Sequence, residues 1–154
     1  MTDVHTPAQR RRNMSAVRSK DTLPEMRIRR GLHRLGFRYT LHHGKLPGHP
    51  DLVLRKHNAV VFVHGCFWHG HECPLFRWPR TRGEFWRAKI RRNREVDRMA
   101  LESLRGLGWR VLTVWECALR GNSRHREDDL LDAIAVWLRS ESPEGELRGQ
   151  GDSS

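Results

Sequence analysis

Apolar side chains at helical spacing begin shortly after residue 20 and predict the first helix. Residues 22–25 read Thr-Leu-Pro-Glu, which combines an N-cap hydroxyl, a proline in the first turn and a glutamate at the capping-box position. The apolar pattern continues to about Leu35 and stops at Gly36, where a helix can end. We therefore expect a helix over residues 22–35.

Three short apolar runs follow the helix, over residues 37–41, 51–54 and 59–63. Each run has the length and composition of a β-strand. A loop rich in Pro and Gly separates the first run from the second, and a polar turn over 56–58 joins the second to the third. The second and third runs are therefore expected to form a hairpin.

The rest of the chain predicts four more segments: an irregular loop (64–83), a long helix (84–106), a strand (109–115) and an amphipathic helix (127–139). Residues 141–154 are rich in Glu, Gly and Ser, and we expect them to be disordered. The order of elements predicts an α/β fold, a mixed β-sheet flanked by helices, in a single domain over residues 1–140.

The excess of basic over acidic residues indicates what kind of partner the protein binds. Lys and Arg number 29 against 18 Asp and Glu, for a net charge of +11, which indicates a polyanion such as nucleic acid. The alternative is that the positive charge serves only to keep the protein soluble. The basic residues 1–20 would form either a disordered tail or an arm along DNA. The sequence contains no apolar run of membrane-spanning length and no signal peptide, so we expect a cytoplasmic protein.

The cysteines indicate a metal site. Cys66, His71 and Cys73 form the pattern C-x4-H-x-C, and the remaining cysteine is Cys117. These residues match a closed tetrahedral zinc site, which would be structural because no position is left for water. His69 could replace His71 as the ligand. Buried free cysteines beside histidines on a solvated loop would explain the same residues without a metal.

A hydrolytic metal site is indicated in the hairpin. Asp51 follows a proline and opens one strand, and the next strand ends at Val63 and His64. This arrangement resembles the split motif of restriction-type nucleases, in which a carboxylate and a residue of the next strand hold Mg²⁺. The usual second carboxylate and lysine are missing, because Val63 and His64 stand in their places. A Pro-Asp pair alone begins many ordinary turns.

The long helix carries a polar interruption in its apolar face. That face consists of Trp86, Ile90, Asn93, Asp97, Leu101 and Leu104. Asn93 and Asp97 need partners if this face is buried. Asp97 could orient a catalytic histidine, or, in a slightly rotated helix, it could be solvated and paired with Arg94 or Arg98.

Glu25 and three histidines complete the candidate groups. Glu25 shares a helix face with apolar neighbours, yet it is also the capping-box partner of Thr22, and the local sequence favours the cap. His64, His69 and His71 cluster beside the strand end. One of them, beyond the zinc ligand, could act as a general base.

The chain strongly resembles the very-short-patch repair (Vsr) endonucleases in five segments: RRRNMSAVRSKDT, LPGHPDLVL, VFVHGCFWHGHEC, TRGEFWRAKIRRNREVDR and GWRVLTVWECALRG. The likeness spans about residues 5–121. It implies a restriction-endonuclease-like fold with one structural zinc. It also implies an enzyme that nicks double-stranded DNA 5′ of the thymine in a T:G mismatch left by deamination of 5-methylcytosine.

The resemblance also implies roles for individual residues. The implied zinc ligands are Cys66, His71, Cys73 and Cys117. Asp51 becomes the carboxylate that holds catalytic Mg²⁺, with two ions expected, and His69 becomes the general base or proton shuttle, oriented by Asp97. Glu25 and His64 are expected in or near the same site.

The resemblance extends to DNA contacts. In the family, aromatic side chains wedge into the base stack at the mismatch, where stacking is weak. A basic arm is expected to bind phosphates in a salt-dependent way. The residues expected to contact DNA are Met14, Phe67, Trp68, Trp86, Asn93, Arg11, Arg12 and Arg18. Without the resemblance, an aromatic residue in a loop belongs to the core more often than to such a wedge.

One departure from the family leaves alternatives open. The family commonly has threonine at the position of Val63, whose backbone carbonyl is expected to bind Mg²⁺, and valine keeps that carbonyl. The alternatives are a zinc DNA-binding module, a mismatch-binding scaffold with a degenerate site, and a restriction endonuclease that cuts paired DNA. We expect a monomer, with mismatch-repair proteins and a repair DNA polymerase acting downstream.

Overall fold

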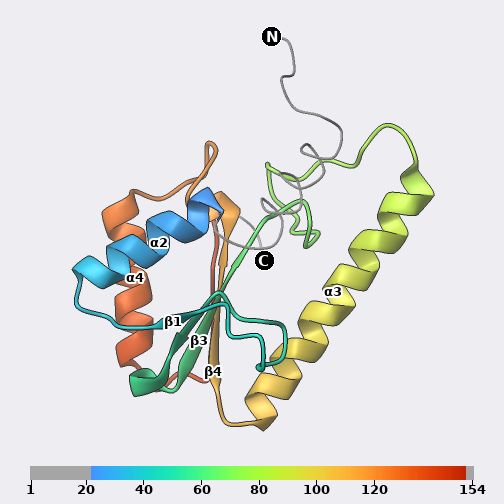
Figure 1. Ribbon diagram of the computed structural model, residues 1–154. Helices are drawn as coiled ribbons and strands as arrows, with labels where there is room; N and C mark the ends of the chain where they lie inside the picture. The colour runs from blue at the N-terminus through green and yellow to red at the C-terminus, as the bar shows by residue number, and fades with distance from the viewer. Residues whose placement is uncertain (1–21, 152–154) are drawn as a thin grey trace, which may run out of the picture.

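The computed structural model describes residues 22–151, whose strands form one five-stranded mixed sheet flanked by helices (Figure 1). The elements along the chain are α2 (Leu23–Arg34), β1 (Thr40–Leu41), β2 (Leu52–Leu54), η1 (Arg55–His57), β3 (Ala59–His64), α3 (Gly83–Gly106), β4 (Arg110–Trp115), η2 (Glu116–Ala118), α4 (Glu127–Arg139) and β5 (Glu144–Leu147). The predicted α/β architecture is therefore confirmed.

The sheet has the strand order β1-β2-β3-β4-β5. The expected hairpin is present: β2 and β3 pair antiparallel with Val53 opposite Val60, and Asn58 takes the left-handed conformation in the turn (φ 52°). β3 pairs parallel with β4, so that His64 lies opposite Trp115. The carboxyl ends of β3 and β4 therefore meet at the same edge, where segments distant in sequence can form a site.

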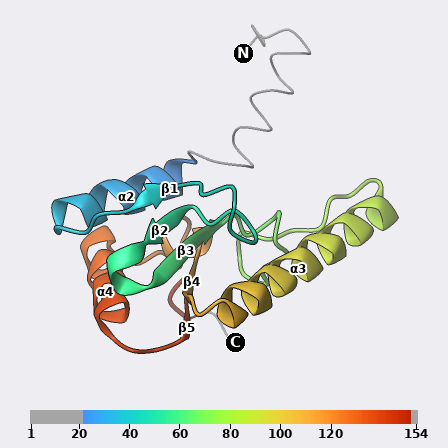
Figure 2. The same ribbon diagram turned by 60° about the horizontal axis from the view of Figure 1, so that its bottom comes forward.

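The two faces of the sheet bury different side chains. Leu52, Val61 and Leu112 belong to a core cluster that includes residues of α2 and α4, whereas Val53 and Val60 belong to a second cluster with Leu104 of α3. This alternation follows from the two-residue period of a strand. The helices α2 and α4 cover one face and α3 approaches the other (Figures 1 and 2).

Helix α3 covers the sheet only near its C-terminal end. Leu104 is completely buried, while the N-terminal part of α3 extends away from the sheet on the side of the preceding loop (Figures 1 and 2). Phe85 in the first turn is 45% exposed. The outer part of α3 therefore presents aromatic and basic side chains beyond the hydrophobic core.

Most element boundaries lie within one or two residues of the predicted ones. The first strand is shorter than expected, because Phe37 is buried in the core, and its N–H donates to the Leu32 carbonyl at the end of α2. Within residues 22–151, no helix has both the length and the apolar character needed to cross a membrane.

The expectation of a disordered tail after Ser140 was wrong for the residues that the structure describes. Glu144–Leu147 form β5, which pairs parallel with β4. The segment has few apolar side chains because an edge strand is held mainly by its backbone hydrogen bonds, which composition does not reveal. Gly145 lies directly against the indole of Trp137 in α4. Residues 152–154 lie outside the described part of the chain.

The contact at Gly145 makes a stability prediction. Gly145→Val would force a branched side chain against Trp137 and Leu112, and we expect it to lower the free energy of unfolding by about 1–3 kcal/mol. Gly106→Ala is the control, because a Cβ at Gly106 meets nothing within 4 Å. Urea unfolding measures both variants. Equal stability of the two variants would contradict the packing of β5 against α4.

Candidate active site and metal centre

The site begins where β2 starts beside the end of β3. Asp51 directly precedes β2, and its Oδ2 accepts a hydrogen bond from the Val63 N–H of β3 at 2.7 Å. Asp51 is 8% exposed, so the Pro-Asp pair belongs to the sheet rather than to a solvated turn. Because Val63 contributes its backbone here, the side chain of valine does not prevent this contact.

The environment of Asp51 disfavours its charge. Burial raises the pKa of this carboxyl from 3.8 to about 8, opposed in part by the Val63 N–H and reinforced by the charge of Glu25. Glu25 is itself only 1% exposed. Two neighbouring buried carboxylates, of which Glu25 is paired with Arg29, form an environment that a divalent cation beside Asp51 would stabilise.

Glu25 serves the helix cap and the site at the same time. Its backbone N–H donates to Thr22 Oγ1 at 3.3 Å, as the N-cap prediction requires. Its carboxylate points inward, where Oε2 lies 3.0 Å from Arg29 Nη1 and 3.0 Å from His42 Nε2. The side chain is therefore part of the polar cluster, while the cap uses the backbone.

His42 is a member of this cluster that the sequence analysis missed. It follows β1, and its Nδ1 lies 3.7 Å from Asp51 Oδ1. Its backbone N–H also donates to the Asp51 carbonyl at 3.1 Å. No periodicity or motif spacing marks His42, because it lies in a loop whose path depends on the pairing of β1 with β2.

A second polar group lies at the end of β3. His69 Nδ1 and Asp97 Oδ2 are 2.5 Å apart, which joins the loop after β3 to α3. Arg94 instead donates to the Gly70 carbonyl, and Arg98 pairs with Glu95 and Glu102 of its own helix. The polar interruption on α3 therefore faces the loop, and the partner of Asp97 is His69.

His64 extends the second polar group to the end of β3. It is the last residue of β3, next to Val63, and its ring stacks on His69 with 3.8 Å between centroids. Burial, reinforced by the charge of His69, holds the pKa of His64 well below its usual value, so its imidazole is neutral. The Asp51 cluster and the His64–His69–Asp97 group thus both lie at the end of β3, where Val63 contacts Asp51 and His64 contacts His69.

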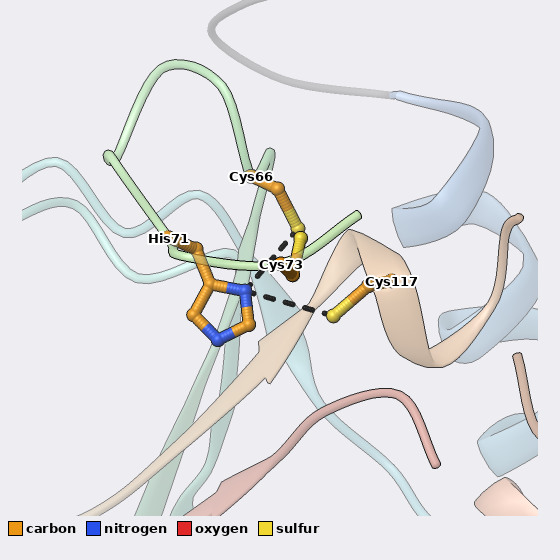
Figure 3. A group of neighbouring side chains, drawn as sticks. All are labelled: Cys66, His71, Cys73 and Cys117. Atoms are coloured by element: carbon orange, nitrogen blue, oxygen red, sulfur yellow. Dashed lines mark hydrogen bonds between the residues drawn. The ribbon is translucent and has the colours of Figure 1, made fainter. Parts of the chain in front are cut away.

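Three cysteines and a histidine converge beside that group (Figure 3). One ligand atom from each of Cys66, His71, Cys73 and Cys117 lies within 4.8 Å of the others. His71 Nδ1 is 3.6 Å from the sulfur of Cys66 and 3.6 Å from that of Cys117. His71, and not His69, is therefore the histidine of this cluster.

The spacing of these atoms fits a tetrahedral metal ion. Zn–S and Zn–N bonds of about 2.3 and 2.05 Å at tetrahedral angles place sulfur and nitrogen about 3.6 Å apart, as observed. Burial raises the pKa of the Cys66 thiol, and the charges of Cys117 and Cys73 raise it further. Neutral thiols would have to be deprotonated by a bound cation, which is how metal binding and proton release are coupled.

Other polar contacts fix the loop that carries the histidines. The Asn93 side chain of α3 donates to the Trp68 carbonyl at 2.7 Å. The Cys66 N–H donates to the Glu116 carboxylate at 3.1 Å, which ties the start of the loop to η2. The ring of His71 stacks on Trp115 with 4.2 Å between centroids. The loop is thus held by α3, β4 and η2.

An aromatic cluster lies between the loop and the outer end of α3. Phe67 contacts Trp86 edge-on with centroids 5.3 Å apart, and Trp68 lies 5.9 Å from the same indole. These three side chains are partly exposed. The other predicted DNA contacts, Met14, Arg11, Arg12 and Arg18, lie outside the described residues.

The mixed sheet, its polar site and the net charge of +11 fit a DNA endonuclease with a restriction-endonuclease-like fold, and the comparisons with known proteins show that class. The family model described as DNA mismatch endonuclease Vsr matches residues 2–75, and the similarity to single relatives extends over nearly the whole chain. The chain belongs to the Vsr family.

Three relatives illustrate the similarity. The DNA mismatch endonuclease Vsr of Escherichia coli (strain K12) is 43% identical over 151 residues, covering 98% of this chain and 97% of the relative. The type II nicking enzyme V.XorIIP of Xanthomonas oryzae pv. oryzae is 47% identical, over 77% of this chain and 88% of its own. The nicking enzyme V.NmeAIP of Neisseria meningitidis is 41% identical, over 82% and 91%.

The raised pKa of Asp51 predicts how stability depends on pH. Between pH 3.8 and about 8 the folded protein keeps the proton that the unfolded chain releases, so this group makes stability fall as pH rises. Asp51→Asn should remove that dependence and stabilise the Mg²⁺-free protein at pH 8 by about 1–3 kcal/mol. Urea unfolding at pH 5 and pH 8 measures the effect.

Asp132→Asn is the matched control, because Asp132 is an exposed carboxylate on α4. It should leave the pH dependence as in the wild type. A wild-type protein that is as stable as Asp51→Asn at pH 8 would show that ionisation of Asp51 does not lower the free energy of unfolding.

Proposed function

We propose that this enzyme nicks one strand of double-stranded DNA 5′ of the thymine in a T:G mismatch, with Mg²⁺ as cofactor. The observation that carries the proposal is the His69–Asp97 pair, with His64 stacked on His69, at the end of the same strand whose Val63 N–H bonds Asp51. The names of the relatives, a DNA mismatch endonuclease and nicking enzymes, support the same activity.

His69 is proposed to take the proton from the attacking water. Its Nδ1 is bonded to the Asp97 carboxylate, which leaves Nε2 as the ring nitrogen that can accept a proton. Asp97 would stabilise the imidazolium that forms and fix the ring orientation, as a carboxylate behind a general-base histidine does. His69 also lines a cavity of about 410 Å³ between α3 and the sheet, which gives water access.

Mg²⁺ would be held by the Asp51 carboxylate and the Val63 backbone carbonyl. The bound ions would neutralise charge on the scissile phosphate and lower the pKa of the attacking water. The donor set fits this role, because Asp51 is a buried carboxylate whose charge needs a cation nearby. The backbone of Val63 is already placed against Asp51, so threonine is not needed for the carbonyl.

The aromatic cluster is proposed as the mismatch wedge. Phe67, Trp68 and Trp86 are partly exposed at the end of the molecule where α3 leaves the sheet. A mismatched step is weakly stacked, so inserting these rings costs less there than at a paired step. Asn93 would act on this wedge through the Trp68 carbonyl, in addition to any contact with DNA.

The cellular setting follows from the same proposal. The enzyme would act as a monomer in the cytoplasm, with the basic N-terminal arm on DNA phosphates through Arg11, Arg12 and Arg18, and Met14 entering the base stack. Mismatch-repair proteins and a repair polymerase would then process the nick. The net charge of +11 supports phosphate contacts that weaken as salt rises.

Strand-specific nicking of oligonucleotide duplexes tests the function. Zinc-loaded protein and Mg²⁺ should cut a T:G duplex once, 5′ of the thymine, in one of a panel of methylation contexts, and should leave matched T:A and C:G duplexes intact. Asp51→Ala should abolish the cut. Tight mismatch binding without cutting in any context would support a binding scaffold instead, and double-strand cutting of paired DNA would support a restriction enzyme.

Substitutions of His69 and Asp97 should lower the nicking rate and leave the affinity for DNA unchanged. His69→Gln should lower the single-turnover nicking rate by about 10²–10⁴-fold, and Asp97→Asn should lower it less, because the histidine remains. Both variants should bind the T:G duplex with wild-type affinity, measured by fluorescence anisotropy. A loss confined to affinity would remove His69 from the proposed chemistry.

The cysteine cluster is proposed to hold one structural zinc. Cys73→Ser should leave the protein with much less than one equivalent of zinc and lower its melting temperature by several degrees, about 2–4 °C for each kcal/mol lost. Glu72→Gln, an exposed neighbour on the same loop, is the control and should keep both. Elemental analysis and thermal unfolding provide the readouts. Unchanged zinc content in Cys73→Ser would contradict the ligand set.

A further inference from the structure

Three polar residues from separate parts of the chain meet beneath the start of β2. Glu25 comes from α2, His42 follows β1, and Asp51 precedes β2. Each offers one ligand atom, and these atoms lie within 4.8 Å of one another. His42 lies between the two carboxylates, and the proposed mechanism gives it no role.

The two ring nitrogens of His42 face different carboxylates. Nε2 lies 3.0 Å from Glu25 Oε2, and Nδ1 lies 3.7 Å from Asp51 Oδ1. The close contact with the Glu25 carboxylate favours the ring proton on Nε2, and in that tautomer Nδ1 presents a lone pair to Asp51. Metal-binding histidines characteristically donate their second N–H to a carboxylate in this way, which fixes the tautomer and strengthens the ligand.

The backbone holds the imidazole in this position. His42 has a φ of +47°, a left-handed conformation that a residue other than glycine rarely adopts. Its N–H donates to the Asp51 carbonyl at 3.1 Å, and the preceding Leu41 pairs with Leu52. These backbone contacts fix where the imidazole lies relative to Asp51.

The chemistry of the donors selects the kind of ion. Arg29 contributes one positive charge to Glu25, at 3.0 Å, while the Asp51 carboxylate faces an imidazole nitrogen. A site made of one carboxylate oxygen and one imidazole nitrogen suits Mn²⁺ and later transition metals, whereas Mg²⁺ prefers oxygen ligands and retains water.

We propose that His42 Nδ1 and Asp51 Oδ1 together bind a divalent metal ion, with Glu25 holding the imidazole in place. The inference rests on the proposed metal-dependent function, because it adds a nitrogen ligand to the carboxylate assigned there. It predicts that the site binds Mn²⁺ as well as the Mg²⁺ of the proposed function. His42 is the ligand, and Glu25 is a positioning residue behind it.

Mn²⁺ binding to the full-length, zinc-loaded protein tests this arrangement without relying on activity. Electron paramagnetic resonance counts free Mn²⁺ during a titration, and electron spin echo modulation detects ¹⁴N bound directly to the ion. The wild type should show ¹⁴N modulation. His42→Gln should lose the modulation and bind Mn²⁺ about tenfold or more weakly, whereas Glu25→Gln should weaken binding about 10–100-fold and keep the modulation.

His49→Gln is the matched control, since His49 is an exposed histidine of the same loop with a similar left-handed φ of +50°. It should behave as the wild type. His64→Gln and His69→Gln keep the test valid if His42→Gln fails to fold, because both should retain the ¹⁴N signal. Loss of the signal in either variant would assign the nitrogen elsewhere and overturn the proposal.

The proposal and the function can fail separately. Mg²⁺-dependent nicking by a wild type that shows no ¹⁴N modulation, or no Mn²⁺ binding, would overturn the role of His42 and leave the nicking function intact. A ¹⁴N signal that depends on His42, in a protein that cuts no mismatched duplex with either metal, would support the site and reject the nicking function.

Discussion

The convergence of Cys66, His71 and Cys73 with Cys117 governs where the other functional groups lie. The first three belong to the loop after β3, and Cys117 belongs to the short helix after β4. None of residues 65–82 belongs to either core cluster, so a cation shared by these ligands would supply the order that a core supplies elsewhere. His69 lies within the same loop, which brings it to Asp97. The Gly149 N–H also donates to the Cys117 sulfur at 3.3 Å, so the segment after β5 supports the cluster.

The buried carboxylates beside the hairpin lower stability and also form the proposed site. Glu25 and Asp51 are the buried charged residues of the described chain, and each would be better tolerated as a neutral or apolar group if stability alone mattered. The contacts that offset this cost, from Arg29, His42 and the Val63 N–H, leave Asp51 with a raised pKa. Asp51 can therefore release its proton when a cation binds. Carboxyl groups with strongly shifted pKa values are characteristic of functional sites.

The elements with strong local signals could be predicted from the sequence, and the long-range contacts could not. The start of α2, the β2–β3 hairpin and the length of α3 follow from capping, turn and periodicity rules. β5 escaped prediction because Glu144 and Glu146 give it a polar composition, while its hydrogen bonds to β4 have no sequence signature. His42 escaped because its place beside Glu25 depends on strand pairing. The local sequence favoured the cap for Glu25 and the family resemblance expected it in or near the site. The structure brings its carboxylate beside His42 and Asp51.

X-ray absorption at the zinc edge tests most directly the claim that a metal ion orders this loop. The purified protein, with zinc at one equivalent, should give a first shell of three sulfurs at about 2.3 Å and one nitrogen at about 2.0 Å, the set offered by the three cysteines and His71. A first shell dominated by oxygen or by several nitrogens would contradict the account. It would mean that the cysteines do not share an ion and that packing alone positions His69.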